Sequence, residues 1–302
     1  MCETLIFDIR RYAINDGPGI RVAIFFKGCN LHCAWCHNPE GISPGPEKIY
    51  TVAKCIKCGT CVAACTEKAI TLLPEGIVPG PGLCTLCEKC AEVCPSKAIE
   101  ISGKSMSVAE IMEIIEKERP FMEQSGGGVT FSGGEPLLQS EMLADLLDEC
   151  GKQGIHRAVD TAGHVKTDIL LEFASRTDLF LYDLKVMDPG LHEKWTGVKN
   201  DLILHNLRRL AGTGANIIIR IPLIAGVNDH EGNIRKTAEF LLSLPEKVME
   251  VQLLPYHSIA QHKYAKLGKS ESFIQLDEPG RNSLDRVSGW FREYGVTVQS
   301  GY

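Results

Sequence analysis

The chain has 302 residues, of which 44% are hydrophobic and 23% are charged, and its formal net charge is −6. This composition is typical of a soluble globular protein, and the length favours one large domain with a smaller unit. The acidic balance argues against a nucleic-acid-binding face, which usually needs an excess of Lys and Arg. No apolar stretch approaches the roughly 18 residues of a membrane-spanning helix. From the charge and from this pattern we expect neither nucleic acid nor a membrane as a partner.

Predicted strands and helices alternate along most of the chain. Strands are predicted at residues 22–27, 128–132, 157–161, 179–184, 216–222 and 249–254, with a last one at 295–299. Amphipathic helices are predicted at residues 140–153, 166–175, 202–211, 232–243 and 283–294. Such units predict a parallel sheet with right-handed crossovers. The number of repeats favours an incomplete barrel over a doubly wound sheet, so the expected class is α/β, a partial (β/α)6 TIM-like barrel.

Residues 47–103 interrupt this alternation after the first barrel strand. They carry eight of the 13 cysteines, and the segment 73–82 between the two groups is rich in Gly and Pro, which form turns. The segment also repeats itself, because Lys-Ala-Ile follows the last cysteine of each group. We therefore expect a barrel formed by residues 1–46 and 104–302, with a ferredoxin-like domain inserted at 47–103.

The two cysteine groups of the insert have the spacing C-x2-C-x2-C-x3-C of bacterial ferredoxins. In that pattern each run gives three thiolates to one [4Fe–4S] cluster and its last cysteine to the other. Two zinc sites are the alternative, although zinc prefers two separated pairs of ligands. The predicted ligand sets are Cys55, Cys58, Cys61 and Cys94 for one cluster, and Cys84, Cys87, Cys90 and Cys65 for the other.

A third run near the N-terminus contains only three cysteines, Cys29, Cys33 and Cys36. A [4Fe–4S] cluster held by three thiolates leaves one iron with an open coordination position, where chemistry can occur. A structural zinc site would need a fourth ligand, and we interpret the neighbouring His32 and His37 as loop residues. The run therefore predicts a reactive iron–sulfur site.

The remaining cysteines stand outside the runs. Cys150 ends an apolar helical stretch and is interpreted as a packing residue, whereas Cys2 has no assignable role. Thiols clustered at metal-ligand spacing, with no recognisable secretory signal, favour a cytoplasmic location. Five further histidines have no recognisable partner and are expected at the surface: His164, His192, His205, His230 and His262.

Chemically capable residues recur at or just after the predicted strands. In barrels the carboxyl ends of the strands line the active site, so the pattern predicts an enzyme. The paired glycines permit close backbone approach to a ligand, and the DGPGIR segment at 16–21 is most simply a tight turn. The strand-end residues are Cys29, Gly133, Gly134, Glu135, Asp160, Thr161, Asp183, Lys185, Arg220, Asn228, Asp229, Tyr256 and His257.

With these motifs assembled, the chain resembles the radical S-adenosylmethionine (SAM) superfamily, and within it the activating enzymes of glycyl radical enzymes. The resemblance covers nearly the whole chain. It rests on DGPGIR at 16–21, the three-cysteine run with HNPE at 37–40, VTFSGGEP at 129–136, DT at 160–161, DLK at 183–185 and LLPYH at 253–257. The insert is typical of a larger subgroup, which makes pyruvate formate-lyase a less expected partner.

The resemblance implies a role for each matching residue. Cys29, Cys33 and Cys36 would hold the catalytic cluster, whose open iron would take the amino and carboxylate groups of SAM. Gly133, Gly134 and Glu135 would lie along the methionine amino group. A monovalent cation, Na⁺ or K⁺, would be surrounded by Asp160, Thr161, Asp183 and the backbone of Leu181. The SAM and peptide pocket would be completed by Lys185, Arg220 and His257, and the incoming glycyl loop would meet Asp16.

The implied reaction is reductive cleavage of SAM to a 5′-deoxyadenosyl radical, which abstracts hydrogen from a glycine of a partner enzyme. The implied cofactors are SAM and three [4Fe–4S] clusters, and the implied partners are a glycyl radical enzyme and an electron donor such as flavodoxin or ferredoxin. We expect a monomer that docks transiently. Two alternatives are a radical SAM enzyme acting on a small molecule or another peptide, and a ferredoxin-type electron-transfer protein.

Overall fold

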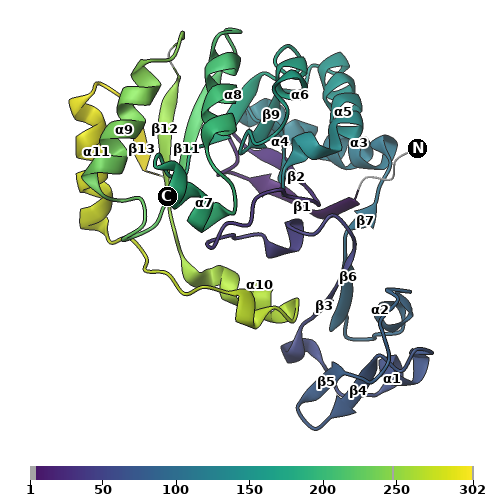
Figure 1. The fold of residues 1–302 in the computed structure, drawn as a ribbon. Coiled ribbons are helices and arrows are strands. Elements are labelled where there is room, and N and C mark those ends of the chain that lie inside the picture. Colours follow the sequence, from purple (N-terminus) through teal and green to yellow (C-terminus); the bar gives the residue numbers. More distant parts are fainter. Residues whose placement is uncertain (1–4, 247, 301–302) are drawn as a thin grey trace.

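A sheet of nine strands forms the centre of the computed structural model, which describes residues 5–246 and 248–300. Its order is β13-β12-β11-β10-β9-β8-β2-β1-β7, and neighbouring strands from β2 to β13 are parallel (Figure 1). The parallel strands follow chain order, without the reversal of a doubly wound sheet. The strands are β1 (Leu5–Ala13), β2 (Arg21–Phe26), β7 (Lys104–Ser105), β8 (Gly128–Gly133), β9 (Arg157–Thr161), β10 (Leu179–Asp183), β11 (Ile217–Leu223), β12 (Glu250–Pro255) and β13 (Val298–Ser300).

The first six predicted strands are confirmed, each with ends within one residue of the prediction. The prediction for the last strand was wrong at its start, since β13 begins at 298 rather than 295. Residues 295 and 296 end the preceding helix instead: Gly295 N donates to the Arg292 carbonyl at 2.9 Å, and Val296 N to the Phe291 carbonyl at 3.2 Å. Hydrogen bonds of this kind satisfy the free carbonyls at a helix end.

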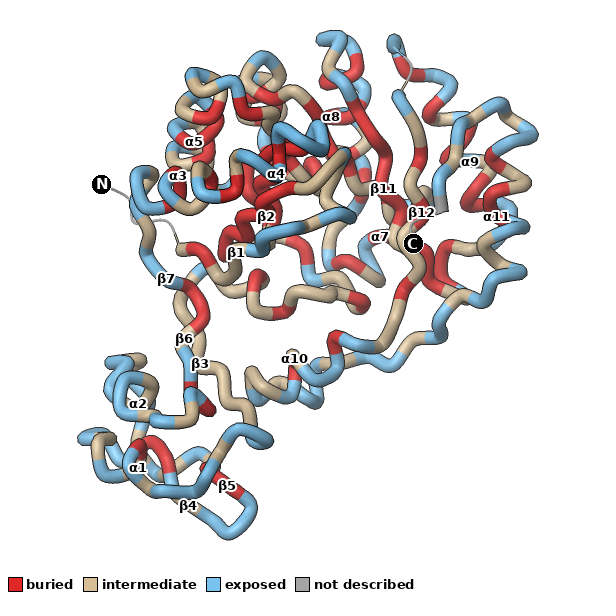
Figure 2. Tube along the Cα trace, turned by 180° about the vertical axis from the view of Figure 1, so that it is seen from behind, coloured by how far each residue is buried: buried red, intermediate tan, exposed pale blue. Residues whose placement is uncertain are grey.

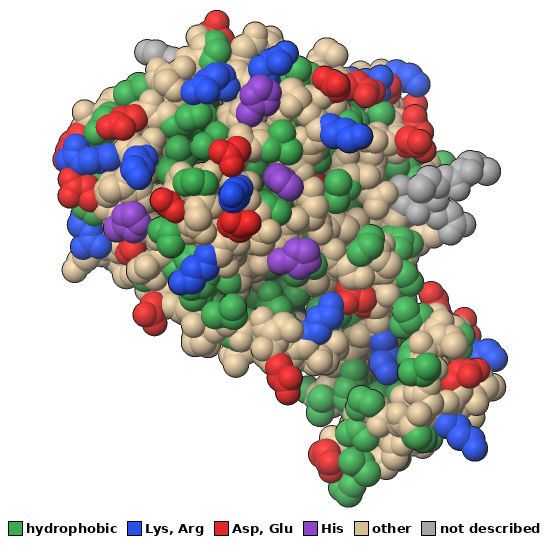
Figure 3. Space-filling model, viewed as in Figure 1, with side chains coloured by type: hydrophobic (Ala, Val, Ile, Leu, Met, Phe, Trp, Pro, Cys, Tyr) green, Lys and Arg blue, Asp and Glu red, His purple; other side chains and the backbone are tan. Residues whose placement is uncertain are grey.

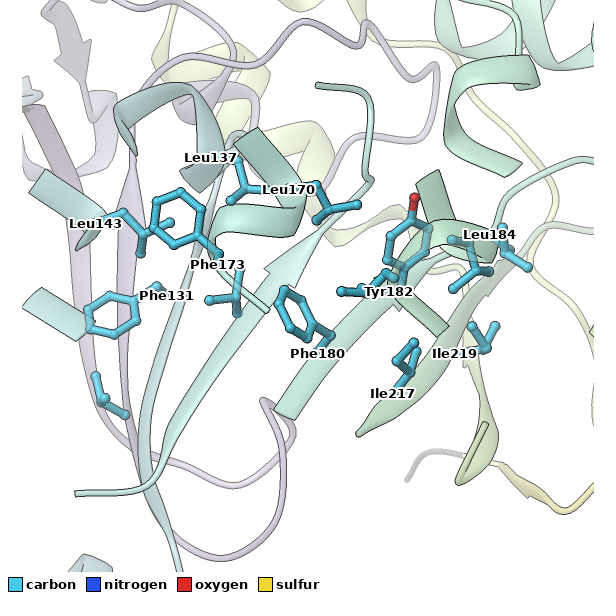
Figure 4. Packing of buried hydrophobic residues seen from close by; sticks show 14 of the residues in the cluster. Phe131, Leu137, Leu143, Leu170, Phe173, Phe180, Tyr182, Leu184, Ile217 and Ile219 are labelled. Atoms are coloured by element: carbon cyan, nitrogen blue, oxygen red, sulfur yellow. The ribbon is translucent and has the colours of Figure 1, made fainter. Parts of the chain in front are cut away.

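Helices cover the outer face of the sheet, with their apolar sides buried against it and their polar sides exposed (Figure 2). Phe180 and Tyr182 of β10 point toward this layer, where Leu170 and Phe173 belong to the same core (Figure 4). The helices of this layer are α3 (Val108–Lys117), α4 (Arg119–Ser125), α5 (Ser140–Lys152), α6 (Thr167–Glu172), α8 (Asp201–Ala211), α9 (Glu231–Leu242) and α11 (Arg281–Glu293). Two more helices, α7 (Pro189–Thr196) and α10 (Gln261–Lys266), contribute no described residue to this core.

Alternation along the strands places a different set of side chains on the inner face. Successive residues of a strand point to opposite faces, so Leu179 and Leu181 of β10 face away from the helices and form a small cluster with Ala158 and Ile218. The same parity puts polar side chains on this inner face nearer the carboxyl ends of the strands: Thr130, Ser132, Asp160, Asp183 and Arg220.

The cysteine-rich segment forms a separate lobe beyond the sheet (Figure 3). Its stem is the antiparallel pair β3 (Glu47–Tyr50) and β6 (Ile99–Ser102), and its tip carries the hairpin β4 (Ile70–Leu73) and β5 (Gly76–Pro79). Two short helices, α1 (Thr60–Ala64) and α2 (Lys89–Glu92), pack together. The lobe has its own small core of Cys61, Ile70, Ile77 and Ile99.

Single residues outside the expected site follow the predictions with one clear exception. Cys150 is buried in the main core with its thiol 3.7 Å from the sulfur of Met112, and Cys2 lies outside the described residues. The prediction that His192 lies at the surface was wrong, because it is only 1% exposed. Its Nδ1 lies 2.6 Å from the Val198 carbonyl, so it ties the end of α7 to the next loop.

Candidate active site and cluster sites

Two cavities lie in the insert, and four cysteines line each of them. Each set combines three thiols of one run with the last thiol of the other. A cavity between four thiols suits a cluster of several irons, whereas a zinc ion draws its sulfur ligands to about 2.3 Å. The first cavity is lined by Cys55, Cys58, Cys61 and Cys94. The second is lined by Cys65, Cys84, Cys87 and Cys90.

Backbone N–H groups support the two thiols that cross between the runs. Ala69 N lies 3.3 Å from Cys65 Sγ, and Ala98 N lies 3.2 Å from Cys94 Sγ. Burial raises the pKa of Cys94, but the hydrogen bonds to its sulfur outweigh this and lower it. Throughout residues 5–246 and 248–300, no three His, Cys, Asp or Glu side chains are arranged to hold a single metal ion.

The three-cysteine run forms a loop directly after β2, at the carboxyl edge of the sheet. Cys29 N donates to the Ile42 carbonyl at 3.0 Å, and Ala34 N donates to the Trp195 carbonyl at 2.9 Å. Burial raises the pKa of the Cys29 and Cys36 thiols to about 12 and also raises that of Cys33. A thiolate at any of these positions therefore requires positive charge nearby, and an iron cluster would supply it.

Opposite charges meet on the inner face of the sheet. Asp160 accepts a hydrogen bond from the Ser132 hydroxyl at 2.7 Å and lies 3.2 Å from an Arg220 nitrogen. Arg220 also lies 4.0 Å from a carboxylate oxygen of Asp16. Lys185 lies 2.7 Å from Asp183. Burial lowers the pKa of Lys185, but Asp183 and the nearby thiols raise it by more, so the net pKa is raised and Lys185 stays charged. These groups come from five separate segments of the chain and share one side of the sheet.

Glu135 is fully buried and tied to the next strand. Its carboxylate accepts hydrogen bonds from the Thr161 hydroxyl at 2.7 Å and from Ala162 N at 3.0 Å. Burial raises the pKa of Glu135 to about 7 despite these donors. The glycine pair before it serves the protein's own packing, because a Cβ on Gly134 would lie 2.1 Å from the Gly28 carbonyl oxygen. Close approach of backbone to backbone therefore requires glycine here.

Comparisons with known proteins agree with this geometry. Residues 85–241 match the family described as Radical SAM superfamily, and residues 54–98 match the 4Fe-4S dicluster domain. The chain is 41% identical to the trans-4-hydroxy-L-proline dehydratase activating enzyme of Clostridioides difficile, over 98% of this chain and 99% of that protein. It is 40% identical to the choline trimethylamine-lyase activating enzyme of Oleidesulfovibrio alaskensis, over 98% and 97%.

The chain belongs to the radical SAM superfamily. Within it, the chain is an activating enzyme of the kind that acts on glycyl radical enzymes. A solved domain of a pyruvate-formate lyase-activating enzyme from Bacteroides vulgatus is 41% identical, covering 58% of this chain and 99% of that one, with a TM-score of 0.51. The superfamily match begins at residue 85 and does not include the Cys29–Cys36 loop. No helix among the described residues has the length and apolar character needed to span a bilayer.

One aromatic residue of this radical SAM protein, His37, was interpreted as a plain loop residue and was not among the predicted site residues. The His37 and His257 rings stack with centroids 4.3 Å apart, and Tyr256 lies beside them. Among the described residues, no hydrogen-bond partner reaches the buried His37 Nε2 and His257 Nδ1, so polar groups of a ligand can satisfy them. Burial lowers the pKa of His37 to about 4, which keeps the ring neutral. The signals in the sequence were the position of His37 directly after Cys36 and its place in the HNPE segment at 37–40.

Proposed function

We propose that this activating enzyme holds its catalytic [4Fe–4S] cluster on Cys29, Cys33 and Cys36 and uses it to generate a radical on a glycine of a partner enzyme. The observation that carries the proposal is the set of three half-buried thiols after β2, within electrostatic reach of Lys185. Burial raises the pKa of these thiols, and bound iron would stabilise their thiolate forms. A set of three leaves one coordination position for SAM.

When bound, the cluster and SAM supply a 5′-deoxyadenosyl radical that takes hydrogen from the α-carbon of the partner's glycine. Gly133, Gly134 and Glu135 line the place of the methionine amino group. The buried carboxylate of Glu135 gains from a cation there, because burial raises its pKa to about 7 even with its hydrogen-bond donors in place. Lys185, Arg220 and His257 complete the pocket for SAM and the peptide.

A monovalent cation, Na⁺ or K⁺, is proposed beside this pocket. Asp160 and Leu181 lie side by side on paired strands, and Asp183 follows two residues later. Burial raises the pKa of Asp160 although Arg220 lowers it, and an added cation would reduce the cost of burying that charge. The proposed ligands are Asp160, Thr161, Asp183 and the backbone of Leu181.

Exclusion of water falls to the residues around the cluster loop. Trp35 packs with Val186, Ile224, Val227 and Tyr256 in a separate apolar cluster. A highly reactive radical has to be shielded from solvent, and we propose that the partner's glycyl loop closes the remaining opening at Asp16. That side chain is 19% exposed.

The insert is proposed to hold two more [4Fe–4S] clusters, one in each four-cysteine cavity, which makes three clusters and about 12 irons per chain. Its proposed limits are residues 47–103, and the sheet of residues 1–46 and 104–302 is proposed to form the wall of a partial (β/α)6 barrel. We further propose a cytoplasmic monomer that receives electrons from a flavodoxin or ferredoxin and docks transiently on its glycyl radical enzyme.

The decisive experiment is anaerobic activation of candidate partners. Reconstituted protein, SAM and reductant are mixed in turn with hydroxyproline dehydratase, choline trimethylamine-lyase and isethionate sulfite-lyase, the enzymes whose activators are similar to this chain. We expect 5′-deoxyadenosine and a glycyl EPR signal with one partner, and neither product with Cys33→Ala. Deoxyadenosine without a radical on any candidate would favour a different substrate, and iron near four per chain would contradict the insert clusters.

A further inference from the structure

Arg21 is a fully buried charged residue that the proposed function leaves without a role. It is 0% exposed, and no carboxylate of the described residues forms an ion pair with it at 4.0 Å or less. Its guanidinium instead donates to the Thr130 hydroxyl at 2.6 Å, the Val129 carbonyl at 2.6 Å and the Pro18 carbonyl at 3.0 Å. Burial lowers its pKa to about 10. A charge buried this way is costly unless its hydrogen bonds serve a purpose.

These hydrogen bonds hold one turn, residues 15–20, between β1 and β2. The Thr130 hydroxyl accepts a hydrogen bond from Arg21 and donates one to the Asp16 carbonyl at 2.6 Å. Arg21 binds the Pro18 carbonyl directly, so both sides of the turn are anchored to one guanidinium. At the far end Ile20 N donates to the Ser125 hydroxyl at 2.8 Å.

The turn has little freedom to move aside. A Cβ on Gly19, whose φ is +69°, would lie 2.5 Å from the Gly127 nitrogen, so this backbone is pressed against the loop before β8. Arg220 donates to the Asn15 carbonyl at 3.4 Å from the opposite side. The Asp16 carboxylate is thereby fixed on the inner face, beside the pair of Arg220 and Asp160.

We propose that Arg21 and Thr130 are positioning residues that lock the 15–20 turn and so hold Asp16 ready for the backbone of an incoming peptide. The inference deepens the proposed function, since it takes the partner's glycyl segment to be that peptide. A turn ordered in advance spares the complex the entropy of ordering it on binding. This pre-ordering raises the affinity for the partner enzyme, whereas the affinity for SAM depends on other residues.

Thr130 offers a pair of variants that separate hydrogen bonding from packing. Thr130→Val keeps the volume and removes the hydroxyl, whereas Thr130→Ser keeps the hydroxyl and loses a methyl group. If the side chain only fills space, Ser is the more damaging change; if it relays hydrogen bonds, Val is. Thr237→Val is the matched control, because Thr237 is 2% exposed and its hydroxyl bonds only within α9.

The first measurement is hydrogen–deuterium exchange of the cluster-containing enzyme, which needs no partner. We expect Thr130→Val to speed exchange across residues 14–20 by about tenfold to a hundredfold, the range for losing one or two buried hydrogen bonds. Thr130→Ser and Thr237→Val should stay within about threefold of the native protein. Unchanged exchange in both Thr130→Val and Arg21→Lys would overturn the inference, whatever the protein's function is.

The second measurement uses the partner identified by activation. We expect Thr130→Val to raise the KM for that partner about tenfold or more, with SAM affinity within about twofold and full recovery of KM in Thr130→Ser. Faster exchange with an unchanged KM would overturn the positioning role. If the native protein generates a glycyl radical on none of the candidate partner enzymes, the proposed function fails. The hydrogen–deuterium exchange experiment alone then decides whether Arg21 and Thr130 hold the turn.

Discussion

Each cavity of the insert draws one thiol from the run that supplies the other cavity. This exchange makes the two sites interdependent, because Cys65 and Cys94 follow α1 and α2 directly and each reaches across to the opposite set. At the scale of single residues, cysteines that are near in sequence therefore need not belong to the same site. Pairs of substitutions can reveal the partition.

Cysteine substitutions should remove iron in steps of one cluster. Cys94→Ala combined with Cys58→Ala should leave about 8 of 12 irons, because both residues line the same cavity. Cys94→Ala combined with Cys87→Ala should leave about 4, since these residues line different cavities. Iron analysis and EPR quantify the loss, and Cys150→Ala, a change in the apolar core, should leave iron intact. Equal loss in the two double variants would contradict the partition.

At the scale of elements, the two cysteine runs share a backbone conformation as well as a spacing. Left-handed residues recur 29 positions apart, at Lys57 and Leu86, at Gly59 and Glu88, and at Lys68 and Lys97. In one run the position after the second cysteine is glycine, and in the other it is glutamate with φ of +64°. A left-handed conformation costs a residue with a side chain about 1–2 kcal/mol.

Glu88→Gly should therefore stabilise the loop that begins at Cys84, by about 1 kcal/mol. The matched change Gly59→Ala should weaken the equivalent loop by a similar amount, because Gly59 has φ of +77°. The readout is the rate at which each cluster is lost to a chelator under anaerobic conditions. Slower loss in Glu88→Gly with faster loss in Gly59→Ala is expected, and the same direction of change in both would refute the strain account.

A carboxylate between β9 and β10 links these two strands. Asp178 accepts hydrogen bonds from Arg157 Nε and a terminal guanidinium nitrogen at 2.9 Å each, and from Arg157 N at 2.8 Å. Partial burial raises the pKa of Asp178, but the bonds to Arg157 outweigh it and hold the pKa below 3.8. Because the folded pKa is depressed, this stabilisation is present above pH 3.8 and is lost as pH falls through the folded value.

Asp178→Asn should lower the free energy of unfolding by about 1 kcal/mol near neutral pH, a value reduced for solvent screening because the side chain is 37% exposed. The deficit should shrink as the pH approaches the pKa of Asp178, where the native protein loses the same interaction. Urea unfolding of the cluster-free protein between pH 3 and 7 measures this. A deficit that is constant over the whole range would show that the charge of Asp178 is unimportant.

At the scale of the whole molecule, the insert and the C-terminal segment meet the sheet at one buried lysine. Lys27 is 0% exposed and lies 2.9 Å from Glu47 at the start of the stem, and it donates to the Glu40 carbonyl at 2.7 Å. Glu47 also pairs with Lys269, beyond α10. Lys263 of α10 lies 2.7 Å from Glu40. This junction ties the lobe to the segment that follows Cys29, Cys33 and Cys36, and Figure 1 shows the lobe leaving the sheet there.

Glu47→Gln should lower the free energy of local opening at this junction by about 2 kcal/mol, because Lys27 would remain buried with only neutral acceptors. Local opening at the two ends of the insert should then become roughly 30-fold more frequent, which limited proteolysis near residues 43–46 and 103–107 detects. Glu100→Gln is the control, since the pair of Lys54 and Glu100 is about half exposed and contributes little. Equal cleavage rates in the two variants would argue against a buried anchor.

Much of the fold followed from local pattern. Apolar runs such as 22–26 lie in strands whose ends fall within one residue of the prediction, because burial on both faces leaves a continuous apolar run. The prediction of the last strand failed at Gly295, because the preceding helix α11 uses this residue to cap its C-terminal end. The predicted exposure of His192 was also wrong, because the sequence of a helix does not show whether a backbone carbonyl elsewhere hydrogen-bonds to a histidine ring.

Cysteine spacing is a local property, and it was enough to predict iron–sulfur chemistry at both ferredoxin-like runs and at the three-cysteine loop. Which distant groups act together became visible in the folded chain alone. Arg220 meets Asp16 from about 200 positions away, His37 stacks on His257, and Arg21 supports the turn before it through Thr130. Such contacts depend on the order and register of the strands, which spacing along the chain does not encode.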